Sequence, residues 1–186
     1  IIFALVALGF ITVSCKKDKK DDVPTPTNPN EEELITSFYI TFEDANGVLP
    51  DVTAAFVDID GPGGNAPTTF DTIRLVNNAT YNATYNATIT LLNESVSPAD
   101  DITVEVQAEG VDHLFCFDVT NGLNLSIAKT DLDANNLPIG LSSQWITTGA
   151  STGTTTIRLK HQPGIKTGDC ALGDTDIELV FETEVQ

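Results

Sequence analysis

From position 34 onward, the chain alternates apolar and polar residues over short segments that are separated by turn residues. The alternation is clearest over residues 37–43 and 154–161, and this period of two predicts strands with one buried face. Asn46-Gly47 and Asn121-Gly122 supply the positive φ angles that tight turns need. We therefore predict about ten strands, at residues 35–43, 52–58, 69–76, 80–92, 102–108, 113–119, 123–130, 139–147, 154–161 and 176–183.

The predicted strands point to an all-β fold, because no window of a dozen residues keeps a helical period. Short strands in such number, with frequent turns, favour a single antiparallel β-sandwich, immunoglobulin-like or a related Greek key. We expect this sandwich to span residues 34–186 as one domain. A closed up-and-down barrel is the alternative arrangement of the same strands.

A four-residue unit recurs almost three times in Asn78-Ala-Thr-Tyr-Asn-Ala-Thr-Tyr-Asn-Ala-Thr88. Four is an even number, so in a strand every Tyr and Ala falls on one face and every Asn and Thr on the other. Tyr81 and Tyr85 are thus expected to share a face. The repeat is too short for a solenoid, and a local duplication in a hairpin arm explains it.

The first 13 residues are an apolar run, followed by Ser14-Cys15 and then by Lys16-Lys-Asp-Lys-Lys-Asp-Asp22. The run is short for a membrane-spanning helix but fits the apolar part of a signal peptide. A small residue before Cys15 at its end resembles a bacterial lipobox. This resemblance implies a signal peptide over residues 1–14, truncated upstream, and acyl chains on Cys15. An uncleaved anchor beside an incidental thiol is the alternative.

Residues 15–33 are rich in charges and proline and contain too little apolar surface to offset the entropy cost of ordering. We expect them to form a tether between the lipid and the domain. Two or three acyl chains would make the anchoring effectively permanent. The Lys/Asp run after Cys15 resembles export signals of outer-membrane lipoproteins, which implies display on the cell surface more than on the periplasmic side.

The formal net charge is −18, from 27 acidic and 9 basic residues. Four of the basic residues lie at positions 16–20, so the part after the tether is still more acidic. Such a charge repels phosphate backbones, which argues against nucleic acid as a partner. It favours a cation or a basic partner, although solubility at a crowded surface explains the same excess.

Only Cys116 and Cys170 remain once Cys15 is lipidated. In an oxidising compartment they are a disulfide candidate that could add about 4 kcal/mol, although Cys116 could also be a buried free thiol. His113 and His161, the two histidines of the chain, lie close to these cysteines in sequence. A disulfide would bring them together with the nearby carboxylates of Asp112 and Asp169, a donor set suited to zinc, copper or iron. Two surface histidines without a metal are the alternative.

Asp131, Asp133 and Asn135 stand at alternate positions, as at the start of a calcium loop. The Glu that such a loop needs at its twelfth position is absent, since Ser142 stands there, and a polar hairpin loop explains the same residues. Asp58-Ile-Asp60 is a second, weaker loop of this kind. Aromatic residues that could stack on a glycan are Tyr39, Tyr81, Tyr85 and Trp145, although a lone Trp is more often in a core.

Catalytic motifs find little support. Gly149-Ala-Ser-Thr-Gly153 has the letters of a nucleophile elbow but lies between predicted strands with no helix after it. No pair of carboxylates stands out for glycoside hydrolysis. We therefore do not predict an enzyme, and we predict no cofactor beyond the transition metal considered above.

Ser14-Cys15-Lys-Lys-Asp, Asn86-Ala-Thr-Ile-Thr-Leu-Leu-Asn-Glu-Ser95 and Leu159-Lys-His-Gln-Pro163 resemble segments of uncharacterised Bacteroidetes-type outer-membrane lipoproteins, which are often encoded beside TonB-dependent receptors. The resemblance implies a non-enzymatic binding or accessory lipoprotein with an outer-membrane receptor as partner. A metal-handling envelope protein and a structural or adhesive surface module are the alternatives.

Overall fold

The computed structural model describes residues 34–61, 64–77 and 82–186. Within these ranges the chain forms eleven strands and one short helix, an all-β fold as predicted. The elements are β1 (Ser37–Asp44), β2 (Val52–Val57), β3 (Thr69–Phe70), β4 (Ile73–Leu75), β5 (Thr84–Asn93), β6 (Asp100–Asp101), α1 (Ile102–Ala108), β7 (His113–Val119), β8 (Leu125–Lys129), β9 (Ser142–Thr147), β10 (Ser151–His161) and β11 (Asp174–Val185).

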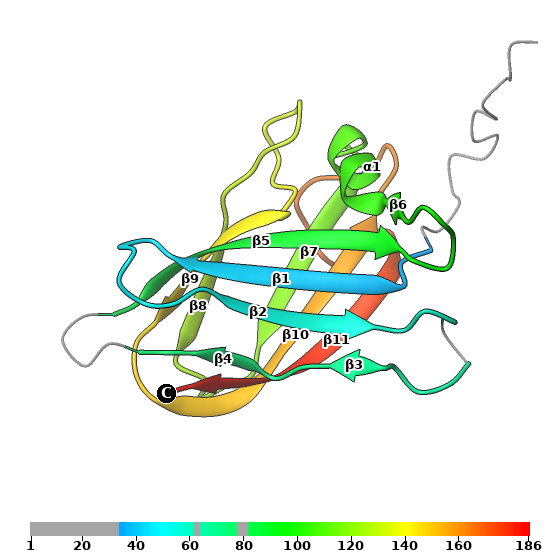
Figure 1. The fold of residues 1–186 in the computed structure, drawn as a ribbon. Helices are drawn as coiled ribbons and strands as arrows, with labels where there is room; N and C mark the ends of the chain where they lie inside the picture. Colours follow the sequence, from blue (N-terminus) through cyan, green and yellow to red (C-terminus); the bar gives the residue numbers. More distant parts are fainter. Residues whose placement is uncertain (1–33, 62–63, 78–81) are drawn as a thin grey trace, which may run out of the picture.

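The strands form two sheets (Figure 1). The larger sheet has the order β3-β2-β1-β5-β9-β8, and β6 pairs with β5 beside this path. The smaller sheet has the order β4-β11-β10-β7. The chain passes from one sheet to the other between β3 and β4, where Asp71 holds the crossing segment to β2: its Oδ2 accepts a hydrogen bond from the Ala55 amide at 3.0 Å.

The core lies between the sheets and follows the predicted alternation. β1 buries every second residue, and β5 continues the pattern through Tyr85. The described part of the repeat thus places Ala83, Tyr85 and Ala87 on the inner face. Trp145 of β9 is fully buried against Phe42, with ring centroids 4.9 Å apart. The fully buried large side chains are Trp145, Tyr85, Phe38, Phe42, Phe115, Phe181, Ile40, Ile73, Leu75, Ile89, Leu91 and Leu114.

The structure corrects the prediction of a strand at residues 102–108, which form helix α1. Ile102 and Val106 are buried and stand four residues apart, which matches one face of a helix. Asp101 caps the helix, because its Oδ1 accepts a hydrogen bond from the Thr103 amide at 3.1 Å. The alternation of apolar and polar residues in this segment therefore indicated a strand where the chain forms a helix.

One strand pair departs from the predicted antiparallel arrangement. β4 pairs with the end of β11 in parallel, with Ile73 opposite Thr183 and Leu75 opposite Val185. The predicted strand 69–76 is divided between the two sheets as β3 and β4. The signal peptide, Cys15, the tether and Tyr81 lie outside the described residues.

Candidate functional site

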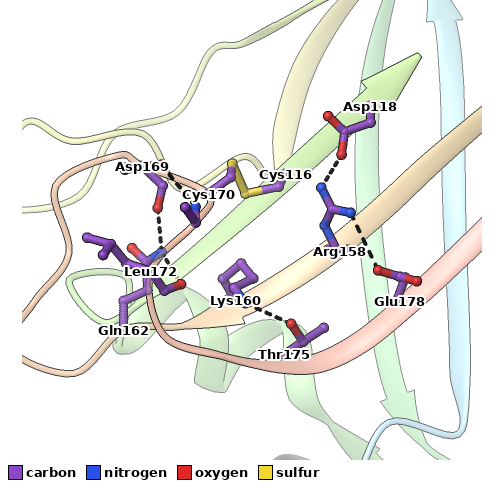
Figure 2. Close-up of a disulfide and its surroundings, with 11 residues drawn as sticks. Cys116, Asp118, Arg158, Lys160, Gln162, Asp169, Cys170, Leu172, Thr175 and Glu178 are labelled. Carbon is purple, nitrogen blue, oxygen red and sulfur yellow. Dashed lines mark hydrogen bonds and ion pairs between the residues drawn. A yellow bond between two sulfur atoms is a disulfide. The ribbon is translucent and has the colours of Figure 1, made fainter. Parts of the chain in front are cut away.

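A disulfide joins Cys116 of β7 to Cys170 in the loop between β10 and β11, with their Cα atoms 5.9 Å apart (Figure 2). The buried side chain of Gln162 is hydrogen-bonded to the same loop: its Nε2 donates to the carbonyls of Asp169 at 2.8 Å and Leu172 at 2.9 Å. The loop that carries Cys170 is thus fixed to the smaller sheet by covalent and hydrogen bonds together.

The pairing of β7 with β10 places His113 opposite His161. The two rings stack with their centroids 4.8 Å apart and their planes within 7° of parallel. His113 is almost fully buried and its Nδ1 lies 3.2 Å from the carbonyl of Glu109. Burial lowers the pKa of His113, and the neighbouring His161 adds to this. The pair is therefore a packed core contact that disfavours the charged form of His113.

The structure does not assemble the metal site predicted from His113, His161, Asp112 and Asp169. The carboxylate of Asp112 accepts from the Gly164 amide at 3.3 Å, and that of Asp169 from the Ala171 amide at 2.9 Å. Two parallel stacked rings direct their nitrogen lone pairs along parallel planes and not toward one ion. Among the described residues there is no group of three His, Cys, Asp or Glu side chains that could hold a metal ion.

The predicted calcium loop is a loop held by its own amides. Asp131 accepts from the amides of Gly140 at 2.7 Å and Ser142 at 3.2 Å. Asp133 accepts from the amides of Asn135 at 2.7 Å and Leu137 at 2.9 Å. Their carboxylates are thus engaged within the protein, and Asn135 contributes its amide to the turn. The polar hairpin loop, the alternative interpretation, accounts for these contacts, and calcium binding stays a prediction.

Lys166 completes this loop from the β10–β11 connection. Its Nζ lies 2.8 Å from Asp133 Oδ2 and 2.6 Å from the carbonyl of Gly110, and both charged side chains are at most 2% exposed. Burial alone would raise the pKa of Asp133, but the hydrogen bond from Lys166 and those from the backbone amides lower it below its ordinary value. The lysine occupies the place that a cation would take beside Asp133.

Glycan stacking on the predicted aromatic residues is also not supported by their positions. Trp145 and Tyr85 are fully buried in the core. Tyr39 is partly exposed, and its hydroxyl lies 3.5 Å from Glu94 Oε2. No aromatic platform is formed by these three residues together.

A pocket of about 560 Å³ is lined by residues from the end of β2, from β3 and from β11. Its volume lies in the range of small-molecule and peptide-side-chain sites. Phe56 and Phe70 line it, with their rings 5.3 Å apart, and Phe70 also packs against Phe181 at 5.1 Å. Phe70 is nevertheless 49% exposed. The remaining lining residues are Leu34, Ile35, Asp58, Gly61, Asp176, Ile177, Glu178, Leu179 and Val180.

Asp58 is the buried acid of this pocket. It is 8% exposed, and its Oδ1 accepts no hydrogen bond from the described residues. Burial raises the pKa of Asp58, and the neighbouring Asp60 carboxyl raises it further. Asp60 is held by the backbone and side-chain amides of Asn65, which lower its pKa. The pocket therefore combines an apolar wall with an acidic group that forms no ion pair with any described residue.

Sequence reasoning missed this pocket, because its walls come from three segments that are far apart in the chain. The acidic pair Asp58 and Asp60 was predicted only as a second, weaker loop of the calcium type.

Compared with known protein families, curated proteins and solved structures, the chain has no match in any of the three. Within the described ranges, α1 is the one helix, and it is too short to cross a membrane.

Proposed function

We propose that the protein is a non-enzymatic binding or accessory lipoprotein of the outer membrane, anchored through Cys15 and displayed on the cell surface. It presents an immunoglobulin-like β-sandwich with Greek-key connections to a ligand or to a receptor partner. The apolar run before Cys15 and the Lys/Asp segment after it support the anchor. The pocket beside β11 supports the binding role.

The buried carboxylate of Asp58 in an apolar pocket is the observation that carries this function. A buried polar atom without a hydrogen-bond partner is unfavourable, and a donor from a ligand would remove that cost. The ligand class that fits is an apolar group with a cationic head. The acidic excess of the chain favours the same class, because it attracts cations at long range.

Calorimetric titration with hexylamine, hexanol and hexanoate would test the binding role. These probes share one chain and differ in the head group, so affinity should fall in that order. Asp58→Asn should weaken hexylamine binding about tenfold or more and leave hexanol binding nearly unchanged, as expected for a lost charge-assisted contact. Asp51→Asn, in the exposed turn at the other end of β2, is the matched control because it removes the same charge. Equal affinity for all three probes, or no binding at all, would refute the proposed site.

The anchor has a separate test. Cells that express the full chain with an alkynyl fatty acid should label the wild-type protein, and Cys15→Ser should abolish the label and release the protein from the membrane fraction. Persistent labelling of the Cys15→Ser variant would contradict lipidation at this residue.

A further inference from the structure

β11 has one open edge along most of its length. It pairs with β10 from Asp174 to Val185, but on its other side β4 covers only Thr183–Val185. Among the described residues, no strand pairs with the part of this edge that precedes Glu182. Figure 1 shows this part of β11 at the side of the smaller sheet, near the ends of β2 and β3.

The backbone of Glu178 and Val180 faces this open edge. Gln186 donates its amide to the Leu75 carbonyl and accepts from the Asn77 amide, so its backbone groups point away from β10. Backbone groups alternate sides along a strand, and the β10–β11 register is regular from Ile177 onward. Glu178 and Val180 therefore present unpaired amides and carbonyls on the same side as Gln186. An exposed row of this kind is a template for another strand.

The pocket lies along this edge. Ile177 and Leu179 direct their side chains toward the core side of β11, whereas Val180 lies on the outer side and is 48% exposed. All three line the pocket together with Phe70 and Leu34. Hydrogen-bonding groups and an apolar pocket thus stand side by side, and alternate side chains of an added strand could enter the pocket.

The charges on β11 indicate what kind of strand fits. The outward-facing residues Glu178 and Glu182 are acidic, and Glu184 continues the row in the part that β4 covers. Arg158 lies 3.5 Å from Glu178 and Arg74 lies 3.1 Å from Glu184. A second copy of β11 paired antiparallel at this edge would set acidic residues against acidic residues, which destabilises a strand pair. Lysine or arginine at alternate positions would meet opposite charges instead.

We propose that an extended segment of a partner protein, with basic residues at alternate positions, adds to the open edge of β11 as a further strand and inserts its other side chains into the pocket beside Asp58. This proposal rests on the proposed binding function of the pocket and adds the open edge of β11 and its acidic row as further points of contact with the same partner. Main-chain hydrogen bonds to Glu178 and Val180 would give the affinity, and the pocket and acidic row would give the selectivity.

Binding of an acetylated and amidated peptide of four Val-Lys repeats to the full chain tests the proposal, with four Val-Glu repeats as the charge control. The Val-Lys peptide should bind at least tenfold more tightly. Amide hydrogen exchange of Glu178 and Val180 should slow in its presence, because their N–H groups become hydrogen-bonded. Two further peptides carry N-methyl groups on alternate amides, and only the peptide methylated on the edge-facing set should lose binding.

Val180→Pro provides the matching change on the protein. It removes one edge-facing N–H without removing a donor to β10. Proline is tolerated at such positions of edge strands. Binding of the Val-Lys peptide should weaken about tenfold or more, whereas Val180→Ala, which keeps the N–H, should retain most of it. The circular dichroism of each variant should match that of the wild type.

The outcomes separate this proposal from the proposed function. Binding of hexylamine without binding of the Val-Lys peptide would overturn strand addition and leave the pocket function standing. Failure of both probes would overturn both. Peptide binding with unchanged exchange at Glu178 and Val180 would place the peptide elsewhere and overturn the proposal. Self-association of the chain that slows exchange at the same two amides would identify a second copy as the occupant and overturn it as well.

Discussion

The buried pair of Asp133 and Lys166 gives a sharp test of how this fold is held together. Asp133→Asn keeps the shape of the side chain and leaves an oxygen for the amides of Asn135 and Leu137, which now bond to Oδ1. It removes the charge that neutralises Lys166, whose other acceptor among the described residues is the carbonyl of Gly110. Since both side chains are at most 2% exposed, little water screens the lone ammonium.

Removing one partner of a buried ion pair typically costs 3–5 kcal/mol, roughly. We expect Asp133→Asn to lower the free energy of unfolding by about 3 kcal/mol. Asp133→Ala should cost about 5 kcal/mol, because two backbone amides also lose their acceptor at about 1 kcal/mol each. Urea unfolding followed by circular dichroism at neutral pH measures both values, and Lys166→Met and the Asp133→Asn/Lys166→Met double variant complete a double-mutant cycle.

The double variant should lose less stability than the two single variants together, because it no longer contains an uncompensated buried charge. A loss below about 1 kcal/mol for Asp133→Asn, or strict additivity in the cycle, would refute this reasoning. A calcium-dependent rise in the melting temperature that disappears in Asp133→Asn would instead support the calcium interpretation of this loop.

The lowered pKa of Asp133 predicts how the stability of the fold changes with pH. The pKa of Asp133 is lower in the folded state than in the unfolded state, so its contribution to stability is complete above the unfolded value and is lost as the pH falls through the folded value. The stability of the wild type should therefore decline on the acid side more steeply than that of Asp133→Asn. Parallel curves for the two proteins would contradict the lowered pKa.

Three further predictions concern the core and the disulfide. Replacing Cys116 and Cys170 by alanine should lower the free energy of unfolding by about 4 kcal/mol, since the bond spans 54 residues; chemical denaturation measures this, and a change below about 1 kcal/mol would contradict it. Burial lowers the pKa of His113, so its neutral form contributes stability that is lost as the pH falls through the folded value; His113→Phe should reduce the decline in melting temperature between neutral and mildly acidic pH, and an unchanged decline would count against this cause. Gly140→Ala should destabilise the fold by roughly 2 kcal/mol or more, because φ is +94° and a Cβ atom would lie 2.8 Å from that of Phe115; thermal unfolding of the variant at or above the wild-type temperature would show that the backbone adjusts.

Much of the fold could be predicted because burial on one face imposes a period of two. The strands around Phe38 and Ile157 follow this rule, and so does the Tyr/Ala face of β5. Helix α1 was not predicted, because its two buried residues, Ile102 and Val106, are too few to show a helical period in a segment whose sequence alternates. The parallel pairing of β4 with β11 was not predicted either, because the local pattern of apolar and polar residues does not determine which strands become neighbours.

The candidate sites were harder to predict than the strands. The register of β7 with β10 brings His113 and His161 together, as the sequence suggested. The carboxylates of Asp112 and Asp169, however, accept hydrogen bonds from backbone amides of nearby loops. Spacing in sequence could not reveal that competition. The pocket depends on where the strands end in space, so the role of a lining residue such as Asp58 could not be predicted without the fold.

Leu34, the first described residue, lines the pocket, whereas Gln186 pairs with Leu75 at the other end of β11. Positions 15 and 34 are 19 residues apart, and a fully extended chain of this length reaches about 65 Å. An anchor at Cys15 would therefore keep the point where the chain enters the domain, beside the pocket, within about 65 Å of the lipid. The pocket would then sample what diffuses along the bilayer surface, so that a membrane-bound partner meets it by two-dimensional search.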